Sequence, residues 1–374
     1  MLRKTIQKLI KHIPSGKYIL FESVPDLSDS TKAVFDEMIH RELNKKYKFI
    51  WMVSDKRKKW PQYCNVKYID NRSAFSRRLL WWYRYRAKCL ISCNRFLKSL
   101  TVNQISFYIT HGTAIKRLGD YTLPANIDYT FVAAEHVREV MAYEMKGDVN
   151  KFVALGYPRN DVLLEKSVDI KTSLNTNCKK IIVWYPTYRQ HISGKKKTGS
   201  SHALPIIHNA EMAKQLNDSA KMNDVLIVLK PHFAQDLSEV KDLKLSNIRF
   251  IDDGFFVENK MSSYEFVGSC DALITDYSSI YYDFTLCDKP IAVIWEDFEE
   301  YQSNPGFAVD VDYYLKGAEK IYTLQEFEQF VTDVSEEKDR LKEARREIRD
   351  LVNYAVDNKN SKRVVDFIIE KARL

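Results

Sequence analysis

One histidine of this chain stands where a side chain could take a proton from a reacting hydroxyl. His111 follows the apolar run Ile105–Thr110 and directly precedes Gly112. An unperturbed imidazole titrates near neutrality, which suits it to act as a general base. Lys116 and Arg117 follow closely, and they predict positive charge near the ring. His111 is therefore a candidate catalytic base, with a purely structural histidine as the alternative.

A second histidine and three more polar side chains also come shortly after apolar runs. Lys230 and His232 follow one such run, and Thr187 and Arg189 follow another. In an open parallel sheet, ligands bind at the carboxyl ends of the strands. We expect these cations and this hydroxyl to meet phosphate oxygens there, although each motif alone is a weak signal.

The best candidate for a phosphate site is the segment Thr275-Asp276-Tyr277-Ser278-Ser279. The sequence contains neither a P-loop nor a G-x-G-x-x-G turn after a strand, so another arrangement must hold any phosphate. An apolar run precedes this segment and a helical pattern follows it, which predicts that Asp276 or a serine caps a helix. Free N–H groups and the positive helix end would then surround Ser278 and Ser279 and could bind a diphosphate. A helix cap without a ligand is the alternative.

Strands and helices must alternate along the chain to position these segments. The predicted strands are Tyr18–Glu22, Phe49–Val53, Ile105–Thr110, Tyr129–Ala133, Lys151–Leu155, Lys180–Trp184, Asp224–Leu229, Ile248–Ile251, Ala272–Thr275 and Pro290–Trp295. The predicted helices include Met1–Ile13, Thr31–Asn44, Arg72–Leu90, Glu135–Lys146 and Asn209–Met222. Alternation of this kind predicts parallel, doubly wound sheets.

The expected fold class is α/β and GT-B-like, with two doubly wound Rossmann-like domains and a cleft between them. This step is an analogy at the level of the fold, and it assigns no chemistry by itself. The expected boundaries are 1–165 for the N-terminal domain, 166–179 for a polar linker, 180–350 for the C-terminal domain, and 351–374 for a C-terminal helix that packs back on the N-terminal domain.

Length and charge narrow the class of protein. With 374 residues the chain can form two hydrophobic cores. Residues 1–120 hold 25 Lys and Arg against 9 Asp and Glu, whereas the remainder holds 33 against 41. A basic first third predicts a polyanionic partner, and no recognisable RNA or DNA module accompanies the charge, so anionic lipid is preferred to nucleic acid. The six cysteines lack zinc spacing and are expected to be reduced thiols.

The predicted helix Arg72–Leu90 favours contact with a membrane surface. One face of this helix would carry Arg77, Trp81, Arg84 and Lys88. A tryptophan among three cations fits the headgroups of anionic lipids. A basic helix whose aromatic side chains pack on its own domain is the alternative. No apolar run is long enough to span a bilayer, so we expect a peripheral protein.

Taken together, these segments resemble the CDP-glycerol glycerophosphotransferase family, the teichoic-acid primases and polymerases. The resemblance covers roughly residues 100–370. The matching motifs are His111-Gly112-Thr113 with Lys116 and Gly119, Gly156-Tyr157-Pro158-Arg159-Asn160-Asp161, Pro186-Thr187-Tyr188-Arg189, Lys230-Pro231-His232, Thr275-Asp276-Tyr277-Ser278-Ser279, Lys289-Pro290-Ile291 and the segment Asp357–Val364.

The resemblance implies transfer of glycerol phosphate from CDP-glycerol to an acceptor hydroxyl, with release of CMP. His111 would be the base, and His232 would be a second catalytic histidine that binds donor phosphate. The donor-binding residues that it implies are Thr113, Lys116, Thr187, Arg189, Lys230, Thr275, Asp276, Ser278 and Ser279. Arg159 and Asp161 are additional candidates whose role the motif leaves open. The N-terminal domain would face acceptor and membrane, and the C-terminal domain would bind the CDP donor.

One departure from the family pattern concerns the transferred group. Pro305-Gly306 stands where Arg-Gly is common in the family. The missing arginine leaves ribitol phosphate or another CDP-linked polyol open as the transferred group. A nucleotide-sugar GT-B glycosyltransferase is a further alternative.

The implied partners are a CDP-activated polyol, a lipid-linked or polymeric acceptor and an anionic membrane at the cytoplasmic face of the cell. No nucleic acid, cofactor or divalent metal is expected.

Overall fold

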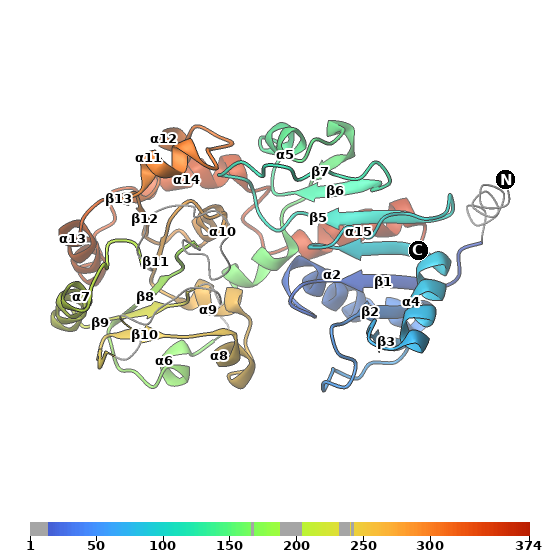
Figure 1. The fold of residues 1–374 in the computed structure, drawn as a ribbon, viewed down its shortest axis with the longest axis horizontal. Coiled ribbons are helices and arrows are strands. Elements are labelled where there is room, and N and C mark those ends of the chain that lie inside the picture. Colours follow the sequence, from blue (N-terminus) through green and yellow to red (C-terminus); the bar gives the residue numbers. More distant parts are fainter. Residues whose placement is uncertain (1–13, 166–167, 188–203, 232–239, 241–242) are drawn as a thin grey trace. The chain divides into compact units, whose positions relative to one another are not determined.

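The computed structural model describes residues 14–165, 168–187, 204–231, 240 and 243–374 (Figure 1). The chain divides into two compact units. Unit 1 comprises the described residues of Met1–Thr113, Tyr121–Asp161 and Asp357–Leu374, and unit 2 comprises those of Ala114–Asp120 and Val162–Val356.

Unit 1 is built on a parallel sheet of seven strands in the order β3-β2-β1-β4-β5-β6-β7. The strands are β1 (Tyr18–Glu22), β2 (Lys48–Met52), β3 (Val66–Ile69), β4 (Ala87–Ser92), β5 (Ile105–Ile109), β6 (Tyr129–Val132) and β7 (Phe152–Ala154). The chain runs outward to one edge through β3 and then returns to the middle at β4. This is a Rossmann order, in which ligands bind beyond the carboxyl ends of the strands where the order reverses.

The strands of unit 1 are apolar because both faces of the sheet are covered. In β1, Ile19, Leu20 and Phe21 are all fully buried. The helices of this unit are α2 (Asp29–His40), α3 (Leu43–Lys46), α4 (Ala74–Arg86), α5 (Arg138–Glu144) and α15 (Asn360–Ala372) (Figure 1). The C-terminal helix α15 belongs to this unit, where it packs against α2 and β5. Its Phe367 meets the rings of Tyr129 and Phe131 edge-on.

Unit 2 repeats the same plan with six parallel strands in the order β10-β9-β8-β11-β12-β13. The strands are β8 (Lys180–Trp184), β9 (Val225–Leu229), β10 (Ile248–Phe250), β11 (Ala272–Thr275), β12 (Ile291–Ile294) and β13 (Glu319–Ile321). The helices are α6 (Ile170–Ser173), α7 (Ala210–Met222), α8 (Asp253–Glu258), α9 (Ser263–Ser269), α10 (Ile280–Phe284), α11 (Phe298–Ser303), α12 (Val311–Tyr314), α13 (Leu324–Ser335) and α14 (Lys342–Val352). The order reverses between β8 and β11, so a second ligand-binding edge is expected there.

The unit boundaries differ from those expected from the sequence. The described part of the expected linker 166–179 belongs to unit 2 and contains α6. Residues Ala114–Asp120 also belong to unit 2, although 1–165 was expected to form one domain. The reason is local pairing, because Lys116 forms an antiparallel bridge with Phe307 and the Arg117 N–H donates to the Gly306 carbonyl at 3.0 Å.

The predicted helix Arg72–Leu90 is wrong at both ends. The helix α4 begins at Ala74 and ends at Arg86, and the chain then enters strand β4. The change takes place at Ala87, whose φ of −60° and ψ of 140° are extended. Lys88 therefore lies in a buried central strand and not on the helix with Arg77 and Arg84. Its Nζ donates to the carbonyl of Arg373 at 2.8 Å.

Candidate functional site

His111 lies just beyond the carboxyl end of β5, where the sequence placed it. Its Nδ1 is 3.3 Å from the carbonyl oxygen of Cys93, which follows β4. A carbonyl can only accept, so Nδ1 carries the proton of the neutral ring and Nε2 keeps a lone pair. The ring is open to solvent on one side. This is the arrangement that a general base requires.

Within unit 1, the positive charge that acts on His111 comes from Arg159, whereas Lys116 and Arg117 belong to unit 2. Partial burial, and then the positive charge of Arg159, lower the pKa of His111 below its ordinary value. Asp29 acts in the opposite direction and raises that pKa. The net shift of the pKa is downward, and the imidazole is therefore neutral near pH 7.

Asp29 and Arg159 form an ion pair in unit 1. Nη1 of Arg159 lies 3.1 Å from both carboxylate oxygens of Asp29, and the two side chains are 7% and 20% exposed. Asp29 opens α2 in a left-handed conformation with φ of 57°, and it also accepts from the N–H of Ser30 at 2.6 Å. Asp29 was not predicted as a site residue, because nothing in its local sequence sets it apart from an ordinary acidic residue at a helix start.

Tyr157 joins the two motifs of unit 1. Its hydroxyl is 2.8 Å from the Thr110 hydroxyl and 3.3 Å from that of Thr113. The guanidinium of Arg159 lies over the Tyr157 ring, 5.5 Å from its centre. Thr113 is buried, and its described contact is therefore with protein rather than with solvent. This contact positions the segment after His111.

Asp161 has a structural role. Its carboxylate oxygens accept from the N–H groups of Asn360 and Ser361, each at 2.8 Å, and so cap the start of α15. The side chain is buried, and this burial raises its pKa even though the two hydrogen bonds lower it. The same cap brings Gly156 against α15, since a Cβ at Gly156 would lie 1.9 Å from the Asn360 side chain. Two motifs separated by some 200 positions in the sequence thus meet in one contact.

In unit 2 the predicted residues gather where the strand order reverses, between β8 and β11. The carboxylate of Asp276 accepts from the Thr187 N–H at 2.7 Å and from the Thr187 hydroxyl. The Thr275 hydroxyl donates to the Tyr185 carbonyl at 2.9 Å. Thr275 and Asp276 are fully buried. They hold the two strand ends together, and of the predicted cap residues, Asp276 or a serine, it is Ser279 that occupies the N-cap position of α10.

Ser278 and Ser279 are half-buried at the start of α10. Ser279 is the N-cap residue but makes no side-chain cap hydrogen bond, and the helix has only five residues. Among the hydrogen bonds of the described residues, none uses the N–H or the hydroxyl of either serine. These four donors remain available at the edge where a ligand is expected. A long helix dipole, however, is not present to support them.

The cations predicted for unit 2 can be placed only in part. Nζ of Lys230 lies 3.1 Å from Asp253 and 5.9 Å from the centre of the Tyr185 ring. The second histidine, His232, and the guanidinium of Arg189 lie outside the described residues. Lys116 is half-buried in unit 2, beside Phe307.

Of the four residues predicted to face a membrane, Arg77, Trp81 and Arg84 lie on α4 and Lys88 does not. Arg77 is exposed and donates to the carbonyls of Asn71 and Arg72. Trp81 is 53% exposed, but burial lowers the pKa of Arg84, and Lys88 is in β4. In the part of the chain that the structure describes, no helix is both long and apolar enough to cross a bilayer. Within the same residues, no group of three or more His, Cys, Asp or Glu side chains is arranged to hold a metal ion.

One buried acid near the reversal point of unit 1 was not predicted. Glu22 ends β1 and accepts from the N–H of Arg95 at 3.0 Å. It is only 2% exposed, and its burial raises the pKa of the carboxyl group. The sequence did signal this position, because Glu22 is an acidic residue at the end of an apolar strand.

Known proteins are similar to this chain over most of its length. Residues 6–370 match the family described as CDP-glycerol:poly(glycerophosphate) glycerophosphotransferase. A teichoic acid glycerol-phosphate transferase of Staphylococcus aureus is 27% identical over 364 residues, covering 85% of this chain and 87% of that protein. A teichoic acid poly(glycerol phosphate) polymerase of Bacillus spizizenii is 26% identical over 332 residues, covering 79% and 78%.

A solved structure of the wall teichoic acid polymerase TagF has the same fold. It covers 100% of this chain and 94% of its own, with a TM-score of 0.76 and 22% sequence identity. The fold class predicted from the sequence, α/β and GT-B-like with two Rossmann-like units, is confirmed. The family match extends over nearly all of the sequence, and the chain therefore belongs to the CDP-glycerol:poly(glycerophosphate) glycerophosphotransferase family.

Proposed function

We propose that this protein transfers glycerol phosphate from CDP-glycerol to an acceptor hydroxyl and releases CMP, in the synthesis of a teichoic-acid-like or capsule polymer. Membership of the family supports the reaction, and the observation that carries the mechanism is the geometry of His111. Its Nδ1 faces the Cys93 carbonyl, so Nε2 is left to accept a proton. The acceptor is a lipid-linked glycan or a growing polyol-phosphate chain.

In this mechanism the acceptor oxygen attacks the phosphorus that carries glycerol. The new bond joins the acceptor oxygen to that phosphorus, and the bond between this phosphorus and the oxygen bridging to the cytidine phosphate breaks. CMP leaves with the electron pair and the negative charge, and the acceptor proton passes to Nε2 of His111. Catalysis of phosphoryl transfer rests mainly on positioning and on charge stabilisation.

We assign binding of the donor diphosphate to unit 2. The free N–H groups and hydroxyls of Ser278 and Ser279 support this role, because these four donors lie where the strand order of unit 2 reverses, between β8 and β11. Lys230 would add positive charge, and His232 and Arg189 are assigned to the same task on the family motif alone. Thr275, Asp276 and Thr187 would hold the strand ends that present the serines.

We also propose a peripheral location at the cytoplasmic face of the cell membrane. The basic first third of the sequence and the exposed aromatic side chains of α4 support it. We expect no requirement for a cofactor. Addition of a chelator should leave CMP release unchanged, and loss of activity that Mg²⁺ restores would refute that part of the proposal.

The central experiment measures release of nucleotide from several donors with the purified full chain. CDP-glycerol should yield CMP, whereas UDP-sugars should yield no UDP. CDP-ribitol is included because the turn at Pro305-Gly306 lacks the arginine common in the family. If CDP-ribitol is the only donor that is turned over, the transferred polyol is ribitol and not glycerol. Turnover of UDP-sugars alone would overturn the assignment.

A variant of the base tests the mechanism itself. His111→Ala should lower kcat by roughly 10²- to 10⁴-fold, the range that general-base catalysis supplies. His40→Ala is the matched control, because His40 is exposed in the last turn of α2 and should leave kcat unchanged. Activity of His111→Ala within about threefold of the parent would contradict general-base catalysis by this residue.

A further inference from the structure

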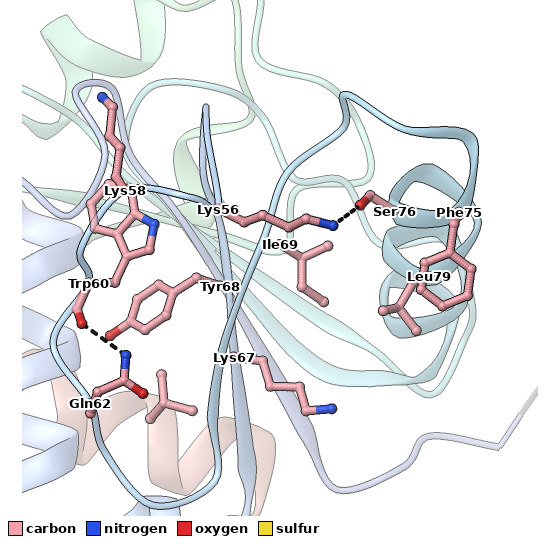
Figure 2. Close-up of a pocket in the computed structure, with 11 residues that line it drawn as sticks. Lys56, Lys58, Trp60, Gln62, Lys67, Tyr68, Ile69, Phe75, Ser76 and Leu79 are labelled. Atoms are coloured by element: carbon pink, nitrogen blue, oxygen red, sulfur yellow. Dashed lines mark hydrogen bonds between the residues drawn. The ribbon is translucent and has the colours of Figure 1, made fainter.

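A pocket of about 320 Å³ lies at the edge of the unit 1 sheet, around strand β3 (Figure 2). Its walls come from β3, from the loop between β2 and β3, and from the first turns of α4. Its lining includes Lys56, Trp60, Lys67, Tyr68, Phe75 and Ser76. The volume is at the small end of the range for ligand sites, and it suits a lipid headgroup better than a nucleotide.

The pocket is distinct from the site around His111. His111 follows β5, and β3 is four strand positions away in the sheet order β3-β2-β1-β4-β5. Neighbouring strands are about 4.8 Å apart, so the two places are separated by roughly 19 Å across the sheet. A group bound in this pocket is therefore not the group that reacts at His111.

The pocket carries two lysines that form no direct ion pair with any residue that the structure describes. Among the described residues, no carboxylate oxygen lies within 4.0 Å of Nζ of Lys56 or Lys67. The acids near Lys56 have other partners as well, and against the effect of burial the charge of Lys56 lowers the pKa of Asp70. Asp55 pairs with Arg57 and Arg72, and Asp70 accepts from the backbone N–H of Lys56.

The two ammonium groups are directed toward α4. Figure 2 shows Lys56 and Lys67 extending on the α4 side of the strand, with Phe75, Ser76 and Leu79 opposite them. Nζ of Lys56 donates to the Ser76 hydroxyl at 2.8 Å, which holds that lysine in place. Two lysines at one side of a small pocket are suited to the oxygens of a phosphate.

Aromatic side chains stand beside these cations and face the solvent. Phe75 is 72% exposed and Trp82 is 52% exposed. They are seven residues apart on α4 with Leu79 between them, so the three share one helix face. Arg86 continues this face, with its guanidinium 5.7 Å from the Trp82 ring. Large exposed apolar side chains next to unpaired cations are typical of a surface that meets the interface of an anionic membrane.

The part of the pocket on the other side of β3 consists of two aromatic rings (Figure 2). The rings of Trp60 and Tyr68 are stacked, with centres 5.7 Å apart. Nε1 of Trp60 donates to the Asp55 carbonyl at 3.1 Å, and the Tyr68 hydroxyl donates to the Pro61 carbonyl at 2.7 Å. Because both polar atoms are satisfied by protein, the rings offer apolar faces to a ligand. Such faces suit the carbon atoms of a glycerol unit.

We propose that this pocket binds the phosphate of an anionic glycerophospholipid headgroup, with Phe75 and Trp82 of α4 reaching the lipid interface. Lys56 and Lys67 contact the phosphate, Ser76 holds Lys56 in place, and Trp60 and Tyr68 line the pocket on the opposite side of β3. The proposal rests on the peripheral membrane location proposed above and gives it a defined site. It also differs from the helix face predicted from the sequence, since Lys88 lies in β4 and Arg84 is half-buried.

The experiment is flotation of the full chain with vesicles, in the absence of CDP-glycerol. Vesicles of phosphatidylcholine and phosphatidylglycerol are compared with vesicles of phosphatidylcholine alone. Lys56→Gln/Lys67→Gln should lower the partition coefficient on the anionic vesicles by roughly tenfold to thirtyfold, because each lysine near the surface contributes about fivefold. Lys98→Gln/Lys221→Gln is the control with the same change in charge at exposed lysines elsewhere. It should change partition by less than about threefold.

The outcomes separate the pocket from the membrane location as a whole. If the parent protein does not float with anionic vesicles, both proposals fail. If the pocket variant floats like the parent, or if the control loses as much as the pocket variant, the site is refuted while the location stands. Phe75→Ser provides a second variant that removes no charge, and it should lower partition as well. If the partition coefficient of Phe75→Ser is unchanged, α4 does not contact the membrane interface.

Discussion

Replacement of Asp161 should destabilise unit 1 without touching the chemistry, although Asp161 lies in a motif shared with the family. In Asp161→Ala, the N–H groups of Asn360 and Ser361 lose the carboxylate that accepts from both at 2.8 Å. A hydrogen bond to a charged group contributes about 1.5–3 kcal/mol. Burial raises the pKa of this carboxyl, so ionised Asp161 also carries a desolvation cost that its removal relieves. We therefore expect a net loss of about 2–3 kcal/mol in the free energy of unfolding.

The matched control is Asp357→Ala, at the start of the same helix. Asp357 accepts from the Lys359 N–H at 3.2 Å and pairs with Arg363, but its side chain is 35% exposed. A pair with this exposure should contribute at most about 1 kcal/mol. The difference between the two variants isolates the buried cap from the general effect of removing an acid near α15.

Urea unfolding followed by tryptophan fluorescence is the appropriate assay. Four of the six tryptophans, Trp51, Trp60, Trp81 and Trp82, belong to unit 1, so the signal reports mainly on that unit. Equal stabilities of Asp161→Ala and Asp357→Ala, within about 0.5 kcal/mol, would refute the cap argument. So would an Asp161→Asn variant that is fully stable but has lost CMP release, because that result would make Asp161 part of the chemistry.

Two further predictions concern charge and donor binding. Arg159→Gln removes a positive charge that lowers the pKa of His111, so the acidic limb of the pH profile of kcat/KM should move to higher pH; Asp29→Asn should move it to lower pH. The base acts when neutral, and identical profiles for the two variants would exclude His111 as the titrating group. Ser278→Ala should raise KM for CDP-glycerol with stability unchanged, whereas Asp276→Ala should cost about 1–3 kcal/mol of stability, because it leaves Thr187 donors unpaired. Donor titration and urea unfolding of both variants check this, and a Ser278→Ala protein with unchanged KM would contradict the donor role.

Strands buried on both faces were predictable from the sequence. Tyr18–Glu22, Lys180–Trp184 and Ala272–Thr275 are found at the bounds expected from their apolar runs. Such strands lie in the middle of a parallel sheet, where hydrophobic content alone is a sufficient signal. The edge strands β3 and β13 were missed, because Val66–Ile69 and Glu319–Ile321 are short, contain charged residues and give no apolar run.

The end of α4 shows a different limit of sequence patterns. Ala87 and the residues after it continue a helical periodicity, and the sequence contains no proline or glycine there to stop it. The chain leaves the helix because residues 87–92 complete the centre of the sheet between β1 and β5. Pairing with two strands from elsewhere in the chain outweighs local propensity, and no window of the sequence contains those partners.

The sequence by itself determined the class of fold, the family and the identity of His111 as a histidine at a strand end. The tertiary structure decided which groups act on that histidine. Arg159 and Asp29 are 130 positions apart in the sequence, yet they form an ion pair. Burial and Arg159 lower the pKa of His111, and Asp29 raises it. Lys116, only five positions from His111, belongs to the other unit. Electrostatic interactions depend on distance through space, and a sequence records only distance along the chain.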